Sequence, residues 1–349
     1  MTPNDVPLQQ GVRMAEKLFN VYVIQGRSPR DFGDCQAALA NVPAHLESLP
    51  FTREEDEIIA RAGDADALIV SSSPMTRRVM SAIKQLKVVV RTGVGYDVID
   101  VPAATDLGIV AVNIPDIWTR EVANHALGLL LAWNRRLATL WNEVKAGVWQ
   151  SQPPGPVGAL HGETVGIVGF GNIGRAFARR VSALETHVIA YDPYVDDAQF
   201  STLGVERVRS LGELAARSDY VSVHTLLNAE THHLINEAFL RQMKPTALLI
   251  NTSRGPVVDE QAIIRALQER WIAGAALDVQ EHEPPAPDNP LSKMDNVILT
   301  PHAAYYSTAA VAQVPRRCGE EVARVLTGQR PLHVVNPEVY ALLQSSRAR

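Results

Sequence analysis

The glycine-rich stretch GFGNIG, residues 169–174, has the residue types and spacing of a dinucleotide-binding turn. It follows an apolar run and precedes a helical pattern at 173–184. Glycines there allow a tight turn and let the backbone approach a pyrophosphate, which the N-terminus of the following helix attracts. Because similar turns also join strands to helices without a ligand, the motif needs support from elsewhere. The predicted cofactor contacts in this turn are Gly169, Gly171, Asn172, Ile173 and Gly174.

An acidic residue, Asp192, ends the next apolar run, 18 residues after Gly174. A carboxylate at this place can accept hydrogen bonds from both hydroxyls of a ribose. It would also repel a 2′-phosphate. Together with the glycine turn, Asp192 therefore predicts that the cofactor is NAD rather than NADP.

Further polar residues collect where predicted strands end, namely His224, the stretch 251–254, Asp278 and His302. Because ligands of open α/β sheets bind beyond the carboxyl ends of the strands, these side chains are candidates for one site. Each has a simpler explanation, since His224 could cap its strand and Asp278 could hold a turn. Their convergence beside a dinucleotide motif favours a site.

Secondary-structure elements must position these residues. Short apolar runs alternate with helical patterns along the chain, and this alternation predicts parallel sheets that are buried on both faces. In the second part of the chain the runs are 165–169, 187–191, 220–224, 247–251, 274–279 and 296–300. The first 115 residues contain similar runs at 20–24, 67–71, 86–90 and 108–112. A nearly uninterrupted helical pattern covers about 119–147, and another helix is expected at about 308–327.

The predicted fold class is α/β, with two Rossmann-like, doubly wound lobes. The last helix is expected to return to the first lobe, which makes that lobe discontinuous. We expect a flavodoxin-like substrate (lid) domain at 1–117 plus about 308–349. An NAD-binding Rossmann domain at 118–307 is expected to be inserted in it.

The bulk properties of the 349-residue chain exclude several classes of protein. The net charge is only −5 and neither end carries a basic run, which argues against a nucleic-acid partner. Cys35 and Cys318 show no metal-ligand spacing and are too few for a disulfide framework, so no metal site is predicted. With no signal-like start and no run of 18 apolar residues, we expect no membrane partner and a cytoplasmic location.

Several stretches resemble the signature blocks of the D-isomer-specific 2-hydroxyacid dehydrogenases. They are RTGVGYDVID (91–100), GFGNIGR (169–175), NTSRGPVVDE (251–260), LDVQEHEP (277–284) and TPHAA (300–304). The resemblance extends from about Val88 to the C-terminal helix, roughly two-thirds of the chain. It implies NAD-dependent reduction of 2-oxo acids to D-2-hydroxy acids, and the reverse reaction, by a homodimer.

The resemblance also implies three catalytic residues. Arg254 matches the arginine that binds the substrate, and a guanidinium can fork onto a 2-oxo group and a carboxylate. His302 matches the acid/base, since imidazole titrates near neutral pH. Glu283 would orient that imidazole and stabilise its charged form.

Other positions are assigned by the same resemblance. The loop Gly93-Val94-Gly95 matches the loop that binds the substrate carboxylate, where backbone N–H groups can face an anion. Asp278 matches the residue that binds the carboxamide of nicotinamide. Thr252 and His224 match positions that line the cofactor groove.

The chain departs from many relatives at Val98, where Asn is common, and at Asn124, where Glu is common. The stretch HAAYYS (302–307) is similar to the branch that holds D-lactate dehydrogenases and the C-terminal-binding protein co-repressors. THHLIN (231–236) favours the same branch. Tyr305 would then lie near the substrate side chain, where it could contact an apolar 2-oxo acid or narrow the pocket. Alternatively, it is a core tyrosine under the C-terminal helix.

Two other functions are compatible with the same residues. One is an NAD(H)-sensing regulatory protein that resembles the co-repressors, in which dinucleotide binding controls association with a partner. The other is oxidation of phosphite or another inorganic substrate on the same scaffold. No additional interaction domain is evident in the sequence, which favours an enzyme.

Overall fold

The computed structural model describes residues 17–150, 152 and 157–347. Two compact units are present. The five-stranded unit contains the described residues up to Ile114 and those from Gln313 onward, and the seven-stranded unit runs from Pro115 to Ala312. The outermost parts of the predicted substrate domain, 1–16 and 348–349, lie outside the described residues. Within the described ranges, no helix has both the length and the apolar character needed to cross a membrane.

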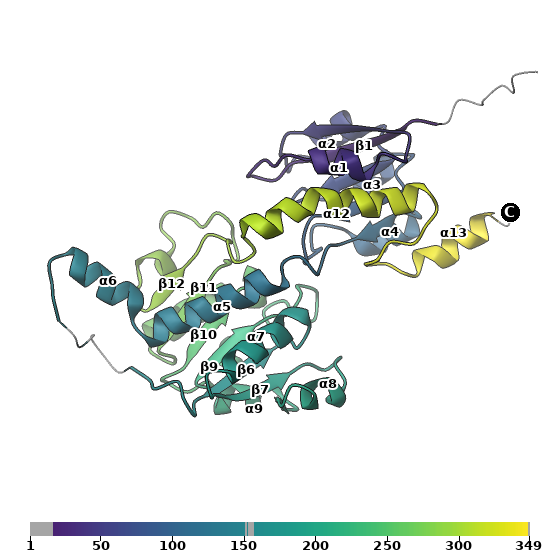
Figure 1. The fold of residues 1–349 in the computed structure, drawn as a ribbon. Helices are drawn as coiled ribbons and strands as arrows, with labels where there is room; N and C mark the ends of the chain where they lie inside the picture. Colours follow the sequence, from purple (N-terminus) through teal and green to yellow (C-terminus); the bar gives the residue numbers. More distant parts are fainter. Residues whose placement is uncertain (1–16, 151, 153–156, 348–349) are drawn as a thin grey trace, which may run out of the picture. The chain divides into compact units, whose positions relative to one another are not determined.

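The five-stranded unit has a parallel sheet in the order β2-β1-β3-β4-β5, the strand order of flavodoxin-like folds. Its strands are β1 (Phe19–Ile24), β2 (Ala44–Leu49), β3 (Ala67–Val70), β4 (Val88–Arg91) and β5 (Val110–Val112). Its helices are α1 (Gly33–Ala38), α2 (Glu55–Ala62), α3 (Arg77–Ala82), α4 (Val101–Asp106) and α13 (Val339–Arg347) (Figure 1).

Strand β2 is absent from the sequence-based prediction for this unit. Its sequence, AHLESL, leaves most of its side chains exposed or half-buried, because β2 pairs with β1 alone at the edge of the sheet. An edge strand of this kind lacks the continuous apolar run by which the four predicted strands were found.

The seven-stranded unit also has a parallel sheet, in the order β12-β11-β10-β9-β6-β7-β8. The strands are β6 (Thr164–Val168), β7 (His187–Tyr191), β8 (Glu206–Arg207), β9 (Tyr220–Val223), β10 (Leu248–Asn251), β11 (Gly274–Leu277) and β12 (Val297–Leu299). The chain proceeds outward from β6 to β8 and then crosses to β9 on the other side of β6. This change of direction is a topological switch point, where open α/β sheets bind ligands.

Helices cover both faces of the seven-stranded sheet (Figure 1). The helices of this unit are α5 (Thr119–Asn134), α6 (Leu137–Lys145), α7 (Asn172–Ser182), α8 (Asp197–Ser201), α9 (Leu211–Arg217), α10 (Glu237–Leu240) and α11 (Glu260–Gln268), with short 3₁₀ turns η1 (Gly255–Val257) and η2 (Pro290–Lys293). Of these, α6 contacts α5 and has no buried residue. Helix α12 (Thr308–Leu326) begins in this unit and ends in the five-stranded unit. The predicted doubly wound α/β fold is confirmed.

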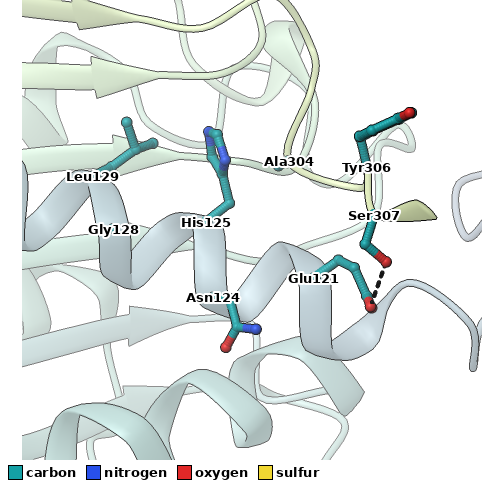
Figure 2. A pocket seen from close by; sticks show the side chains of 8 residues that line it. All are labelled: Glu121, Asn124, His125, Gly128, Leu129, Ala304, Tyr306 and Ser307. Atoms are coloured by element: carbon teal, nitrogen blue, oxygen red, sulfur yellow. Dashed lines mark hydrogen bonds between the residues drawn. The ribbon is translucent and has the colours of Figure 1, made fainter. Parts of the chain in front are cut away.

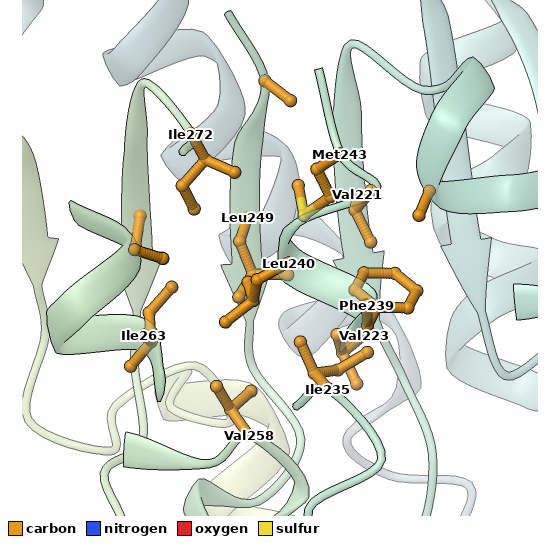
Figure 3. Packing of buried hydrophobic residues seen from close by; sticks show 14 of the residues in the cluster. Val221, Val223, Ile235, Phe239, Leu240, Met243, Leu249, Val258, Ile263 and Ile272 are labelled. Atoms are coloured by element: carbon orange, nitrogen blue, oxygen red, sulfur yellow. The ribbon is translucent and has the colours of Figure 1, made fainter. Parts of the chain in front are cut away.

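Alternate residues of each strand enter different apolar clusters, because successive side chains of a strand point to opposite faces. Val221 and Val223 pack with Phe239 and Leu240 of α10, as Figure 3 shows. Tyr220 joins the cluster on the other face, which contains residues of α5 and α7. The sheet is therefore buried on both sides.

The nearly uninterrupted helical pattern predicted at about 119–147 consists of two helices, α5 and α6. Arg136 interrupts them with a left-handed backbone, at φ 53°. Tertiary contacts fix this break: Asn134 Nδ2 donates to Gly158 O at 3.1 Å and to Tyr220 Oη at 2.9 Å. The helical pattern of the sequence contains no information about such contacts between distant residues.

Candidate active site

The glycine turn between β6 and α7 has the shape that a bound pyrophosphate requires. Gly169 has φ +92°, and a Cβ atom there would lie 2.9 Å from the backbone of His224. A Cβ atom on Gly174 would lie 2.2 Å from Gly169 O. A Cβ atom on Gly171, by contrast, would meet no described atom within 4 Å. The turn is therefore tight against the protein and open at Gly171, beside the N-terminus of α7.

Asp192 is fixed to this turn by its carboxylate. Its Oδ2 accepts a hydrogen bond from Phe170 N at 2.8 Å, and its Oδ1 accepts one from Tyr194 N at 2.9 Å. Each oxygen retains a second lone pair, because a carboxylate offers about four acceptor positions. The half-buried carboxylate can thus accept ribose hydroxyls next to the pyrophosphate turn.

Buried polar atoms without a hydrogen-bond partner among the described residues lie just after β9 and β10. They are His224 Nδ1, Thr225 Oγ1 and Thr252 Oγ1. Such atoms are costly unless a ligand or water satisfies them. The polar atoms and the open turn fit a dinucleotide that is laid across the switch point.

The His224 ring is neutral at physiological pH. Burial lowers the pKa of His224 to about 3, from an ordinary value of 6.5. Its Nε2 lies 2.9 Å from Ser222 Oγ, which fixes the plane of the ring. A neutral imidazole can offer one nitrogen as a hydrogen-bond donor or acceptor without placing a charge in the groove.

Asp278 holds the backbone turn that presents His302. Its Oδ1 accepts hydrogen bonds from Thr300 Oγ1 at 2.6 Å and Ala303 N at 2.9 Å, and its Oδ2 accepts one from Ala304 N at 2.9 Å. The buried carboxylate therefore has the turn-holding contacts that the simpler explanation predicts. Contact with the nicotinamide carboxamide stays a prediction for this residue.

His302 and Glu283 form a direct pair at the end of the sheet. His302 Nδ1 lies 2.7 Å from Glu283 Oε2, and the two side chains are 39% and 33% exposed. Because Nδ1 is engaged with the carboxylate, Nε2 is the nitrogen that can exchange a proton with a bound molecule. The backbone of His302 is left-handed, at φ 53°, and its N–H donates to Asp278 O at 2.7 Å.

The carboxylate of Glu283 remains charged in this partly closed environment. Burial by itself would raise the pKa of Glu283, but the hydrogen bond and charge of His302 oppose that effect. The backbone N–H of Gln280 and the charge of Arg254 act in the same direction, and the net result is a lowered pKa. Glu283 can therefore stabilise an imidazolium at His302.

Arg254 lies in a turn that follows β10 and is packed against the loop carrying Glu283. Asn251 Nδ2 donates to Arg254 O at 2.9 Å. A Cβ atom on the next residue, Gly255, would lie 1.9 Å from Gln280 O, so this contact requires glycine. The structure thus brings Arg254, Glu283 and His302 to one edge of the seven-stranded sheet.

Tyr305 contacts aromatic neighbours, among them the buried Trp118. Its ring meets Trp118 edge-on, with centroids 5.2 Å apart, and lies 6.4 Å from the ring of His302. Tyr305 is half-buried, whereas the next residue, Tyr306, is 64% exposed. Trp118 and Tyr305 therefore form an aromatic wall beside His302.

A shallow pocket lies between α5 and the segment that follows His302, as Figure 2 shows. Ser307 Oγ donates to Glu121 Oε1 at 3.1 Å on its wall. His125 Nε2 lies 3.0 Å from Thr300 Oγ1, which connects α5 to the Asp278 turn. The lining residues are Glu121, Asn124, His125, Gly128, Leu129, Ala304, Tyr306 and Ser307. None of the three predicted catalytic residues lines this pocket.

The predicted substrate loop, 93–95, belongs to the five-stranded unit and follows β4. Gly93 and Gly95 are buried, and Val94 O accepts a hydrogen bond from Asn113 Nδ2 at 2.7 Å. A Cβ atom on Gly93 would overlap the guanidinium of Arg91. The role of the loop in binding a carboxylate stays a prediction.

Some residues of the site were not found from the sequence. Thr225 carries one of the unpaired hydroxyls, Gly255 allows the Arg254 turn to pack, and Trp118 forms half of the aromatic wall. Thr225 directly follows the singled-out His224, so the strand end was the available signal. Nothing in the spacing connects Trp118 with Tyr305, which lies 187 residues later.

Comparisons with known proteins agree with this fold and with the sequence resemblance. Residues 127–304 match the family model described as D-isomer specific 2-hydroxyacid dehydrogenase, NAD binding domain. The chain is 42% identical over 286 residues to a glyoxylate reductase of Korarchaeum cryptofilum, covering 81% of this chain and 86% of that protein. It is 38% identical over 283 residues to a D-3-phosphoglycerate dehydrogenase of Methanocaldococcus jannaschii, covering 81% of this chain and 54% of that protein.

Among solved structures, the chain is similar to D-lactate dehydrogenase from Aquifex aeolicus, complexed with NAD and lactic acid. The TM-score is 0.78 and the sequence identity is 28%, and the match covers 88% of this chain and 96% of that one.

Proposed function

The chain belongs to the D-isomer specific 2-hydroxyacid dehydrogenase family, and from this premise we propose that it reduces a small 2-oxo acid to the D-2-hydroxy acid with NADH. It is an oxidoreductase that acts on CH–OH groups and carries an NAD-binding domain. The observation that carries the proposal is the His302–Glu283 pair at 2.7 Å, which supplies an acid/base at the sheet edge where cofactors bind.

In this proposal His302 and Glu283 act together in proton transfer. During reduction, the Nε2 proton of the His302 imidazolium passes to the carbonyl oxygen of the 2-oxo acid, which becomes the hydroxyl. The ring is left neutral, and it takes a proton from solvent before the next turnover. Glu283, at Nδ1, keeps the ring in one orientation and favours its charged form. In the reverse direction the neutral ring removes the hydroxyl proton.

Arg254 binds and polarises the substrate. A guanidinium can donate two parallel hydrogen bonds, to the carboxylate and to the 2-oxo group, and it stays charged at every relevant pH. The predicted loop Gly93-Val94-Gly95 would supply backbone N–H groups to a substrate carboxylate. We assign the five-stranded unit as the substrate domain on this basis.

The cofactor would be held by the glycine turn at its pyrophosphate, by Asp192 at its ribose, and by His224 and Thr252 in the groove. Bound NADH supplies the hydride that the carbonyl carbon receives. Asp192 supports NAD over NADP, because its carboxylate would repel a 2′-phosphate.

The substrate is proposed to be small, with glyoxylate as the first candidate. Two observations support this: relatives at 42% and 40% identity are named glyoxylate reductases, and the bulky rings of Trp118 and Tyr305 lie beside His302. The names of these relatives are those of enzymes, which supports the dehydrogenase over the NAD(H)-sensing regulator. The predicted nearness to the D-lactate dehydrogenase and co-repressor branch stays a prediction.

The test is NADH oxidation by the purified protein with glyoxylate, pyruvate and phenylpyruvate, with NADPH in parallel. We expect turnover with NADH, highest with glyoxylate, and formation of D-2-hydroxy acid wherever the product is chiral. Tight NADH binding without turnover on any 2-oxo acid would contradict the proposal and favour the regulator.

We also propose that the protein is a homodimer in solution. On and just after α6, Trp141 and Trp149 are 65% and 89% exposed, and Leu137, Val144 and Val148 are exposed beside them. Light scattering should give twice the 38.1 kDa mass of the chain, and Trp141→Ser with Trp149→Ser should lower that mass. The cytoplasmic location stays a prediction.

A further inference from the structure

We propose that His232, His233 and Glu281 form a binding site for one divalent first-row transition-metal ion, such as Zn²⁺, on the seven-stranded unit. One ligand atom from each of the three side chains lies within 4.8 Å of the other two. In the described ranges, no other group of three His, Cys, Asp or Glu side chains is arranged in this way. The proposed dehydrogenase reaction uses none of these residues.

The ligand set suits such an ion chemically. Imidazole nitrogen and carboxylate oxygen are preferred by Zn²⁺, Co²⁺ and Ni²⁺, and two histidines with one glutamate leave a fourth position for water. In a tetrahedral zinc site the ligand atoms are roughly 3.4 Å apart. His232 is exposed, so a small rotation of its ring can close the remaining distance.

Glu281 is already oriented as a ligand. Its N–H donates to Glu260 Oε2 at 3.1 Å, and its Oε2 accepts the N–H of Glu260 at 3.2 Å. This reciprocal pair at the start of α11 fixes the carboxylate and leaves Oε1, which lies 2.9 Å from His233 Nε2. Outer contacts of this kind are what orient the ligands of metal sites.

The loop that carries the histidines is also fixed before any ion binds. His232 N donates to Asn228 O at 3.0 Å, and His233 N donates to Pro256 O at 2.8 Å. The backbone of His233 is left-handed, at φ 51°, and the two rings are stacked with centroids 4.0 Å apart. Adjacent histidines in an extended strand would point to opposite sides, whereas this turn places both rings together.

Metal binding would replace the hydrogen bond between His233 and Glu281. The ion would take the place of the proton between Nε2 and Oε1. From a neutral His233 ring that proton would move to Nδ1, and from a charged ring it would pass to solvent, so the metal-bound ring is neutral with its proton on Nδ1. The ion would join the loop after β9, which begins with His224, to the loop after β11, which carries Glu283. Since only the folded state has this arrangement, bound metal would raise the melting temperature.

The test is titration of the chelator-treated, full-length protein with ZnCl₂ in the presence of NADH, followed by calorimetry and thermal melting. We expect one saturable site, a raised melting temperature, and at least tenfold weaker binding in His232→Ala. His161→Ala is the matched control, because His161 pairs with Glu185 at 2.9 Å on the surface with no third ligand described there. It should bind zinc as the wild type does.

A second measurement uses Co²⁺, whose visible absorption reports tetrahedral coordination. The band should appear in the wild type and His161→Ala and be absent in His232→Ala. Absence of saturable zinc binding in the wild type, or equal binding in His232→Ala, would overturn the proposal. These readouts are independent of dehydrogenase activity.

Discussion

The ring of His302 and the carboxylate of Glu283 are joined at 2.7 Å although they lie on different loops, one after β12 and one after β11. Adjacent parallel strands bring these loops together, since β11 pairs directly with β12. The pairing of these two strands therefore places the His302 ring beside the Glu283 carboxylate.

Glu283→Gln should lower kcat by roughly 100-fold or more, because the amide cannot stabilise the imidazolium of His302. NADH affinity, measured by fluorescence titration, should change little. Glu230→Gln is the control, since it removes an exposed carboxylate that accepts a hydrogen bond from the hydroxyl of Tyr194. Unchanged kcat in Glu283→Gln would exclude the paired acid/base.

The lowered pKa of the half-buried His224 predicts that the protein loses stability in mild acid. Its folded pKa of about 3 lies below its ordinary 6.5, so the unfolded state binds the extra proton between these values. The free energy of unfolding should therefore fall as the pH drops below 6.5, by about 2 kcal/mol at pH 5 from this group. In His224→Gln, urea unfolding at pH 7 and pH 5 should show that much less difference, whereas the exposed His161→Gln should behave as the wild type.

Asp192→Asn should reduce the preference for NADH over NADPH by about tenfold or more, a change of ~1.4 kcal/mol. Asparagine can still accept the N–H of Phe170, so the turn should remain folded while the charge is removed. Asp196→Asn, on the exposed surface nearby, carries the same change in net charge and should leave the preference unchanged. The ratio of kcat/KM for the two cofactors is the measurement.

Two glycines of the same turn should respond differently to alanine. Gly174→Ala forces a Cβ atom to 2.2 Å from Gly169 O, and we expect a loss of about 1–3 kcal/mol in the free energy of unfolding. Gly171→Ala meets no described atom and should keep the melting temperature. It should nevertheless weaken NADH binding, by about tenfold, because the methyl group occupies the space left for the pyrophosphate. Equal melting temperatures and equal NADH affinities in both variants would contradict this.

Tyr305→Ala should shift substrate preference toward larger 2-oxo acids, because it removes half of the aromatic wall beside His302. We expect kcat/KM for phenylpyruvate to rise about tenfold relative to glyoxylate. Tyr306→Ala, which changes an exposed neighbour, should leave the ratio unchanged. An equal loss for both substrates would mean that Tyr305 supports the fold only.

The fold was predictable from the sequence wherever strands are buried on both faces. The runs that became β6, β9, β10 and β11 are short, mostly apolar and buried, and their alternation with helices identifies a doubly wound sheet. The pattern failed at the edge strands β2 and β8, which are largely exposed or half-buried. It also did not locate the break at Arg136, where side-chain contacts with distant residues end a helix. These exceptions depend on tertiary neighbours that local periodicity does not contain.

The polar residues of the site were predictable as a group, because parallel strands collect their carboxyl ends at one edge. The individual contacts of these residues were not predictable. The contacts of Asp278 with Ala303 and Ala304, and the unpaired hydroxyl of Thr225, depend on how loops fold back over the sheet. Sequence order alone does not specify those approaches.

The left-handed backbone of His302 limits what evolution can place there. At φ 53° histidine, asparagine, aspartate and glycine are tolerated, whereas β-branched residues are strained. A descendant that abandoned catalysis would therefore be expected to carry asparagine or glycine at this position rather than valine or threonine. Asparagine or glycine at this position would remove the acid/base without straining the backbone. A non-catalytic lineage could therefore persist as a folded cofactor-binding protein.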